Sequence, residues 1–121
     1  MIDSGGKGDA IPALDGIRAA DGDPVARDQI SIAVTAGRLE YDDGASQVFE
    51  SNGNTTYVES GHPTRGEWSV DDDGHFCSFW PPSYRASYDL RWTVENDAIT
   101  GLRFVELTGG AEFTGRYRLV R

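Results

Sequence analysis

The segment Tyr84–Glu95, with the sequence YRASYDLRWTVE, alternates apolar and polar residues with great regularity. Side chains of a β-strand point alternately to its two faces, so a period of two residues predicts a strand with one buried face. The predicted inward residues are Tyr84, Ala86, Tyr88, Leu90, Trp92 and Val94, and the predicted outward residues are Arg85, Ser87, Asp89, Arg91, Thr93 and Glu95. The segment therefore indicates an all-β fold.

Shorter alternations of the same kind lie on both sides of this segment. We expect strands at residues 30–34, 38–41, 46–51, 99–107 and 113–120. Turn pairs that tolerate a positive φ recur from residue 37 to the end: Asp43 with Gly44, Asn52 with Gly53, Asp73 with Gly74, Asn96 with Asp97, and Gly109 with Gly110. Connections of hairpin length join antiparallel strands, so the sheet is predicted to be antiparallel.

The number of strands and their one-sided pattern narrow the architecture. About eight strands with one apolar face can remove their exposed edges by closing into an up-and-down barrel. A two-sheet β-sandwich is the alternative. Gly101 and Gly115 interrupt two of the alternations, and glycine inside a strand often marks a bulge or a sharp coil.

The first part of the chain has a different composition. Residues 1–22 contain few large apolar side chains and many glycines, which predicts a flexible N-terminal arm ahead of a single barrel domain at residues 23–121. Asp23 can cap a helix and Pro24 suits its first position, so a short helix is expected over residues 24–28. That helix would close one end of the barrel.

Composition excludes some classes of function. The chain has 121 residues, enough for one domain, and a formal charge of -9, which opposes binding to nucleic acid. Cys77 is the only cysteine, so no intramolecular disulfide can form. No apolar run approaches the roughly 20 residues of a membrane span, and residues 1–10 are polar and rich in glycine where a signal peptide would need an apolar stretch. We expect a cytoplasmic protein, or an extracytoplasmic one if a leader was removed; the oligomeric state stays open.

The middle of the chain carries a recognisable order of residues. Gly66, Glu67 and Trp68 precede an acidic turn at residues 71–74, then come Cys77, Trp80, Pro81 and Tyr88. This order resembles small bacterial lipocalin-like proteins of unknown function, which are calycin-type barrels, and the resemblance covers about residues 37–121. It implies a cup-shaped barrel that binds a small apolar molecule without shared catalytic machinery. A second cysteine of that pattern is replaced here by Ala86.

Aromatic residues are the candidates for a binding site. Trp68, Trp80, Tyr88 and Trp92 fall on predicted strands, where they either fill the barrel or line a pocket. Arg103 shares a predicted face with Ile99 and Val105, so it is expected to point inward and to bind a carboxylate. The strand pattern leaves both a packed core and a ligand pocket open.

Signals for other chemistry are weak. His62 and His75 have no metal-ligand spacing, and residues 71–73 lack the pattern of a calcium loop, so we expect no metal site. Cys77 has no base at a defined offset, and we predict no catalytic residue and no cofactor.

Three hypotheses for function remain. The first is a non-enzymatic binder of a small apolar or aromatic ligand, with the corner at Pro81 and Pro82 on the rim of the barrel. The second is a protein-interaction or inhibitor module whose acidic loops at residues 42–44 and 71–74 dock on a basic partner. The third is a small barrel enzyme, such as a cyclase or isomerase. A continuous apolar cavity of about 300 Å³ or more would favour a ligand over a protein partner.

Overall fold

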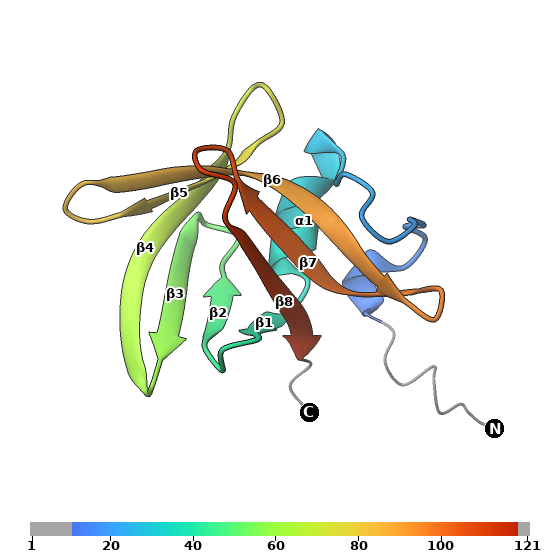
Figure 1. Cartoon of the computed structure of the whole chain (residues 1–121), viewed down its shortest axis with the longest axis horizontal. Helices are drawn as coiled ribbons and strands as arrows, with labels where there is room; N and C mark the ends of the chain where they lie inside the picture. The colour runs from blue at the N-terminus through green and yellow to red at the C-terminus, as the bar shows by residue number, and fades with distance from the viewer. Residues whose placement is uncertain (1–10, 119–121) are drawn as a thin grey trace.

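The computed structural model describes residues 11–118 and shows a closed antiparallel β-barrel (Figure 1). Every strand pairs with the next one in sequence, and the first pairs with the last. The predicted up-and-down barrel of eight strands is confirmed, and the β-sandwich is wrong. The strands are β1 (Arg38–Tyr41), β2 (Ser46–Phe49), β3 (Asn54–Glu59), β4 (His62–Val70), β5 (Phe76–Trp80), β6 (Tyr84–Glu95), β7 (Ala98–Glu106) and β8 (Glu112–Arg118).

The predicted turn pairs all lie between strands. Gly44 connects β1 to β2 with a φ of 92°, and Asn96 and Asp97 connect β6 to β7 with φ values of 52° and 65°. These angles are in the left-handed region, which glycine, asparagine and aspartate tolerate better than other residues. The turn chemistry therefore sets the spacing of the strands.

The helix lies later in the chain than the sequence predicts. The 3-10 helix η3 (Arg27–Gln29) runs directly into α1 (Ile30–Thr35). Ile30, Ala33 and Val34 are buried, whereas Ile32 is 44% exposed. This burial follows the i, i+3, i+4 spacing of a helix face. The strand expected at residues 30–34 is wrong because three β-branched apolar residues at alternate positions mimic a strand in so short a segment.

Residues 22–25 lie along β6. The N–H of Val25 donates to the Leu90 carbonyl, and the N–H of Gly22 donates to the Trp92 carbonyl, both at 2.9 Å. Pro24 forms a β-bridge with Arg91. Proline is suited to the edge of a sheet, where its missing N–H is not needed, so the helix expected over residues 24–28 is wrong.

This segment completes a sheet that β5 leaves unfinished. β5 has five residues and pairs with only the first part of β6, from Tyr84 to Tyr88. Beyond that point residues 22–25 take over as the neighbour of β6. The N-terminal part of the chain is thus part of the barrel wall.

One end of the barrel is packed solid by this N-terminal part. Figure 1 shows the described chain before α1 on the side of the molecule opposite to the projecting β5–β6 hairpin, with α1 between the two in this view. The buried core there includes Ile11, Leu14, Val25, Ile30, Val34, Leu39, Trp92 and Leu102. The Tyr117 hydroxyl donates to the Ala33 carbonyl and ties β8 to α1. We call this the closed end.

The predicted arm is therefore wrong for residues 11–22. Ile11 and Leu14, next to and within the 3-10 helix η2 (Pro12–Leu14), are buried in the core. Asp21 accepts a hydrogen bond from the Val94 N–H at 3.0 Å. Two isolated apolar residues were too weak a pattern to predict this packing. Residues 1–10, for which the arm was also predicted, lie outside the described residues.

Gly101 and Gly115 lie where two strands approach closely. A Cβ on Gly101 would clash with the Gly115 carbonyl oxygen. The register between β6 and β7 shifts beside Gly101, between Thr93 and Val94. The predicted irregularity at Gly101 is confirmed. None of the helices in the described part of the chain has the length and apolar character needed to cross a bilayer.

Candidate functional site

A cavity of about 540 Å³ enters the barrel at the end opposite to α1, which we call the open end. The hairpins β1–β2, β3–β4, β5–β6 and β7–β8 all turn at this end, because strands alternate in direction around the barrel. The lining residues are Tyr41, Asp42, Asp43, Gln47, Phe49, Tyr57, Glu59, Thr64, Phe76, Ser78, Trp80, Tyr84, Tyr88, Phe104, Glu112, Phe113 and Thr114. The volume lies within the range of small-molecule pockets.

Three phenylalanines close the cavity at its inner end. The ring centroids of Phe76 and Phe104 are 5.4 Å apart, and those of Phe49 and Phe76 are 5.6 Å apart, both in edge-to-face contact. All three side chains are buried. Aromatic pairs of this geometry stabilise each other beyond simple burial of area. This phenylalanine floor separates the cavity from the packed closed end.

A buried polar chain lies in the wall above the floor. The Tyr41 hydroxyl donates to Gln47 Oε1 at 2.6 Å, Gln47 Nε2 donates to Thr55 Oγ1 at 2.9 Å, and the Thr55 hydroxyl donates to the Val48 carbonyl. Burial, the neighbouring phenols and Asp43 together raise the pKa of Tyr41 far above its usual value of 10.0. Tyr41 therefore stays protonated and acts as a hydrogen-bond donor.

Ser78 adds a buried hydroxyl with free hydrogen-bonding capacity. Its side chain lines the cavity, the residue is 7% exposed, and among the described residues no group lies in hydrogen-bond geometry with Oγ. Burial raises the pKa of Tyr88, and the Ser78 hydroxyl close to the phenol partly offsets that rise. The distance and angle between the two hydroxyls nevertheless do not meet those of a hydrogen bond. A buried polar atom in this state is stabilised by a partner such as a ligand atom or water.

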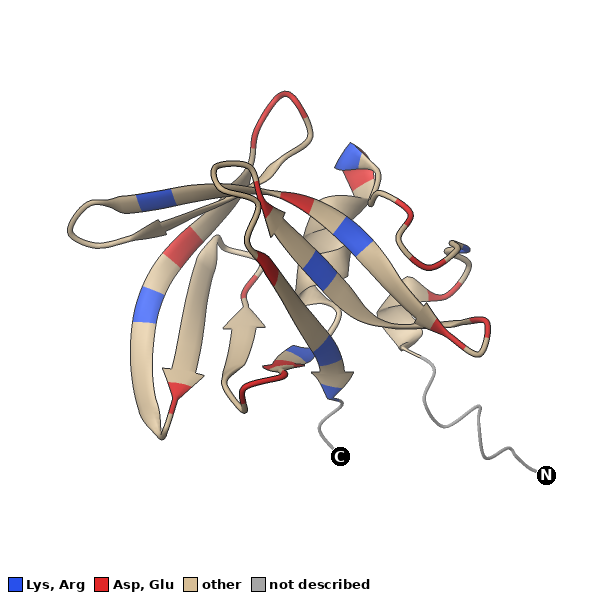
Figure 2. Ribbon diagram, viewed as in Figure 1, with Lys and Arg blue, Asp and Glu red and all other residues tan. Residues whose placement is uncertain are grey.

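Carboxylates surround the mouth of the cavity. Asp42 and Asp43 belong to the β1–β2 turn, Glu59 ends β3 and Glu112 begins β8. Figure 2 shows that acidic positions gather in loops and at strand ends, whereas many basic positions lie along the strands. No lysine, arginine or histidine is found among the described residues that line the cavity.

Two of the five residues predicted to bind a ligand line this cavity. Trp80 ends β5, and Tyr88 lies on the inward face of β6. Pro81 and Pro82 follow Trp80 in the β5–β6 turn, at the rim, as expected. Tyr84, at the other side of the same turn, donates a 3.3 Å hydrogen bond to Glu106.

The two other predicted tryptophans lie away from the cavity. Trp68 stacks on Phe76 at 6.1 Å and donates its indole N–H to the Glu50 carbonyl, next to the β2–β3 turn of the closed end. Trp92 is 2% exposed and packs in the closed end. Both are on the inward face of their strands, but the alternation of a strand does not tell which end of a barrel a residue reaches.

The prediction that Arg103 points into the barrel is wrong. Its neighbours Leu102 and Phe104 are both buried, so Arg103 is on the outer face of β7. There it lies 3.7 Å from Asp21. The prediction failed because the register shift between Thr93 and Val94 breaks the alternation of β7: Ile99 pairs with Val94 and packs against the core, whereas Arg103 and Val105 are on the outer face.

The structure adds residues that the sequence did not single out. Tyr41, Gln47, Tyr57 and Phe104 line the cavity. Tyr41 alternates with Leu39 on β1, so the period-two pattern could have identified it. Asp42 and Asp43 were predicted to belong to a hairpin turn and to an acidic docking loop, and only the closure of the barrel places them at a cavity mouth.

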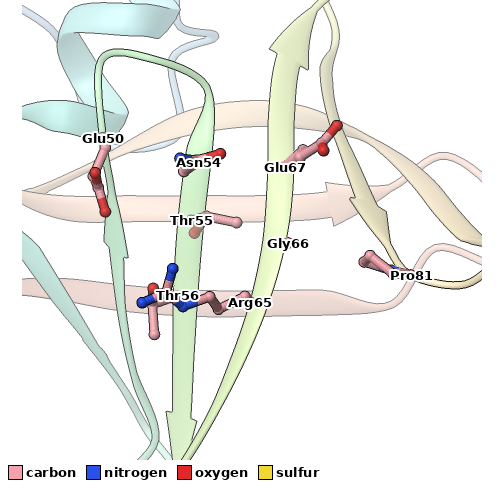
Figure 3. A pocket seen from close by; sticks show the side chains of 8 residues that line it. All are labelled: Glu50, Asn54, Thr55, Thr56, Arg65, Gly66, Glu67 and Pro81. Carbon is pink, nitrogen blue, oxygen red and sulfur yellow. The ribbon is translucent and has the colours of Figure 1, made fainter.

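A second, smaller hollow lies on the wall between β3 and β4 (Figure 3). Its volume is about 160 Å³, and it is lined by Glu50, Asn54, Thr55, Thr56, Arg65, Gly66, Glu67 and Pro81. Most of these side chains are exposed. The hollow is small and polar, and we assign no ligand to it.

Asp71, Asp73 and His75 come together in the β4–β5 turn at the closed end. Asp71 Oδ1 accepts hydrogen bonds from the N–H groups of Asp73 and His75, and Oδ2 lies 3.3 Å from His75 Nδ1. These hydrogen bonds lower the pKa of the Asp71 carboxyl, and the bond from the His75 N–H has the largest effect. The arrangement is that of a turn stabilised by its own aspartate.

Comparisons with protein-family models, with curated proteins and with solved structures each found no match to this chain. The resemblance to lipocalin-like barrels therefore stays a hypothesis drawn from the residues themselves. The cavity has to be interpreted from its own geometry.

Proposed function

We propose that this protein binds a small, largely apolar molecule in the barrel cavity and does not transform it. The observation that carries the proposal is the cavity of about 540 Å³ above the phenylalanine floor. It exceeds the roughly 300 Å³ expected of a small-molecule site, and aromatic side chains dominate its lining. The burial of apolar ligand surface there would supply most of the binding energy.

The polar groups of the cavity suit recognition better than catalysis. Burial raises the pKa of Tyr41 and Tyr88, so neither phenol serves as a base near neutral pH. The Ser78 hydroxyl has no base beside it among the described residues. These groups fix the orientation of a ligand by hydrogen bonding.

The alternative of one acidic docking surface receives less support. The acidic loops at residues 42–44 and 71–74 join β1 to β2 and β4 to β5, which places them at opposite ends of the barrel. A single partner surface could not contact both loops without spanning the molecule. The aromatic lining has no role in that hypothesis.

Binding of the neutral naphthalene probe dansylamide tests the proposal. We expect its fluorescence to rise and shift to shorter wavelength on addition of the protein, with saturation at one probe per chain. Ser78→Leu should weaken this binding at least tenfold, because the larger side chain occupies the cavity. Ser87→Leu is the matched control, since Ser87 pairs with the outward Cys77 on the outer face. No saturable binding to the wild type, or equal effects of the two variants, would refute the proposal.

A further inference from the structure

The lining of the cavity carries charge of one sign. Asp42, Asp43, Glu59 and Glu112 all contribute to it, and they come from different hairpins around one mouth. Charges of one sign around a recessed site with apolar walls focus the electrostatic field in that site. The cavity mouth is therefore a region of negative potential.

These mouth carboxylates have no cationic partner among the described residues. None of the four forms an ion pair with any residue between 11 and 118. By contrast, Glu40 pairs with Arg118 at 2.9 Å, and Glu95 is bound by Arg116 through both carboxylate oxygens. These two arginines of β8 are engaged away from the mouth, so no ion pair within the described chain neutralises its negative potential.

The field of the carboxylates reaches the aromatic wall. Burial raises the pKa of Tyr57, and Asp43 and Glu59 raise it further. Asp43 also contributes to the raised pKa of Tyr41. The part of this rise that comes from Asp43 and Glu59 reflects a negative potential at the rings, and a negative potential favours a positive charge at the same place.

The aromatic rings can hold a cation directly. Tyr57 lies 6.2 Å from Tyr41 and 6.3 Å from Trp80, measured between ring centroids, and all three rings line the cavity. A cation within about 6 Å of a ring centroid is attracted by the negative face of the ring, most strongly for tryptophan. The buried Ser78 hydroxyl, without a partner among the described residues, offers a hydrogen bond deeper in the cavity.

We propose that the ligand is an organic cation, an amine whose ammonium group lies among the mouth carboxylates and the tyrosine and tryptophan rings while its apolar part extends toward the phenylalanine floor. This inference rests on the proposed function and specifies the chemical class of its ligand. It follows from a cavity that combines aromatic walls with four carboxylates that form no ion pair among the described residues.

Three dansyl probes of graded charge test the inference. Dansylcadaverine carries an ammonium group, dansylamide is neutral, and dansyl-6-aminohexanoate carries a carboxylate on a linker of similar length. At about 20 mM NaCl we expect dansylcadaverine to bind at least about tenfold more tightly than dansylamide, and the carboxylate probe to bind most weakly. The preference for the cation should decrease at about 500 mM NaCl, because exposed carboxylates are screened by salt.

A matched pair of double variants locates the charge preference. Asp43→Asn with Glu59→Gln should abolish the preference for dansylcadaverine while the affinity for dansylamide stays within about twofold. The amide oxygen introduced by Asp43→Asn can still accept the 3.0 Å hydrogen bond from the Ala45 N–H that supports the turn. The control, Asp72→Asn with Asp73→Asn, removes the same charge at the closed end and should leave the preference intact.

The possible outcomes separate the two proposals. Binding of dansylamide without a preference for the cation, or a preference that survives Asp43→Asn with Glu59→Gln, would overturn the inference and leave the proposed function standing. Failure of all three probes to bind would overturn both. A preference lost only in the mouth variant would support both.

Discussion

The two ends of this barrel are built from the same strands but have opposite interiors. On β6, Trp92 and Tyr88 share the inward face, yet Trp92 is packed in the core and Tyr88 lines the cavity. The closed end receives extra apolar side chains from residues 11–34, including Ile30 and Val34. At the open end, no segment between residues 11 and 118 fills the interior in this way.

The difference shows what makes a barrel hollow. An eight-stranded barrel is wide enough for either a packed interior or one small ligand. Here the strands alone do not fill it, and a short helix with the chain before it completes the packing on one side only. The cavity is the half that received no such segment.

Tryptophan substitutions at the two ends should differ most in their effect on stability. Trp92→Ala removes a buried indole and should lower the free energy of unfolding by about 3–5 kcal/mol. Trp80→Ala, at the cavity wall, should cost about 1 kcal/mol. Urea denaturation of both variants measures the difference. Similar losses in the two variants would mean that the open end is packed like the closed one.

The packing of α1 is tested by two isoleucines of the same helix. Ile30 is fully buried and Ile32 is 44% exposed. We expect Ile30→Ala to cost about 2–4 kcal/mol and Ile32→Ala less than about 1 kcal/mol. Thermal and chemical unfolding give both values. If residues 30–34 formed a strand instead, Ile30 and Ile32 would share a face and the two losses would be alike.

Unfolding at alkaline pH should show whether the tyrosine hydroxyls at the two ends are equally shielded from water. Burial raises the pKa of Tyr41 and of Tyr117 above 10.0. Above pH 10 the two tyrosines lose their protons in the unfolded chain but keep them in the folded chain. The free energy of unfolding should therefore fall by about 1.4 kcal/mol per pH unit for each tyrosine as the pH rises above 10.

Single substitutions show how much each tyrosine contributes to this pH dependence of the unfolding free energy. Tyr117→Phe and Tyr41→Phe should each reduce the dependence of the unfolding free energy on pH between about 10 and 11.5, as measured by urea denaturation. Equal reductions are expected if both hydroxyls are shielded from water. A smaller reduction for Tyr41→Phe would contradict the dry polar chain in the cavity wall and show that water reaches Tyr41.

Arg103→Ala should have the smallest effect. Its contact with Asp21 is 3.7 Å long and partly exposed, and such ion pairs contribute little. We expect a loss within about 0.5 kcal/mol and unchanged affinity for dansylamide. A marked loss of probe binding in fluorescence titrations would show that Arg103 reaches the cavity after all.

The sequence was sufficient for β6 and for the turns between strands because both signals are local. The alternation in β6 and the turn pairs, such as Asn96 with Asp97, are determined by residues within a few positions. Trp80 and Tyr88 were found for the same reason, since their inward orientation follows from the period of two.

Several of the errors concern contacts between distant parts of the chain. Ile11 and Leu14 are isolated in the sequence and become core residues only because the closed end offers a surface for them. Trp92 and Tyr88 differ only in depth along the barrel, which no periodicity records. The mouth carboxylates Asp42 and Glu112 are far apart in the sequence and meet through the pairing of β1 with β8.

The pairing of β1 with β8 also has a consequence for biosynthesis. Arg38 is opposite Arg118, so the barrel cannot close until the ribosome has released nearly all of the described chain. Residues 22–25 likewise wait for β6, which is made much later. Such long-range pairing slows folding. The nascent chain therefore passes through a period in which β1 is an unpaired edge, when pairing with another chain competes with completion of the fold.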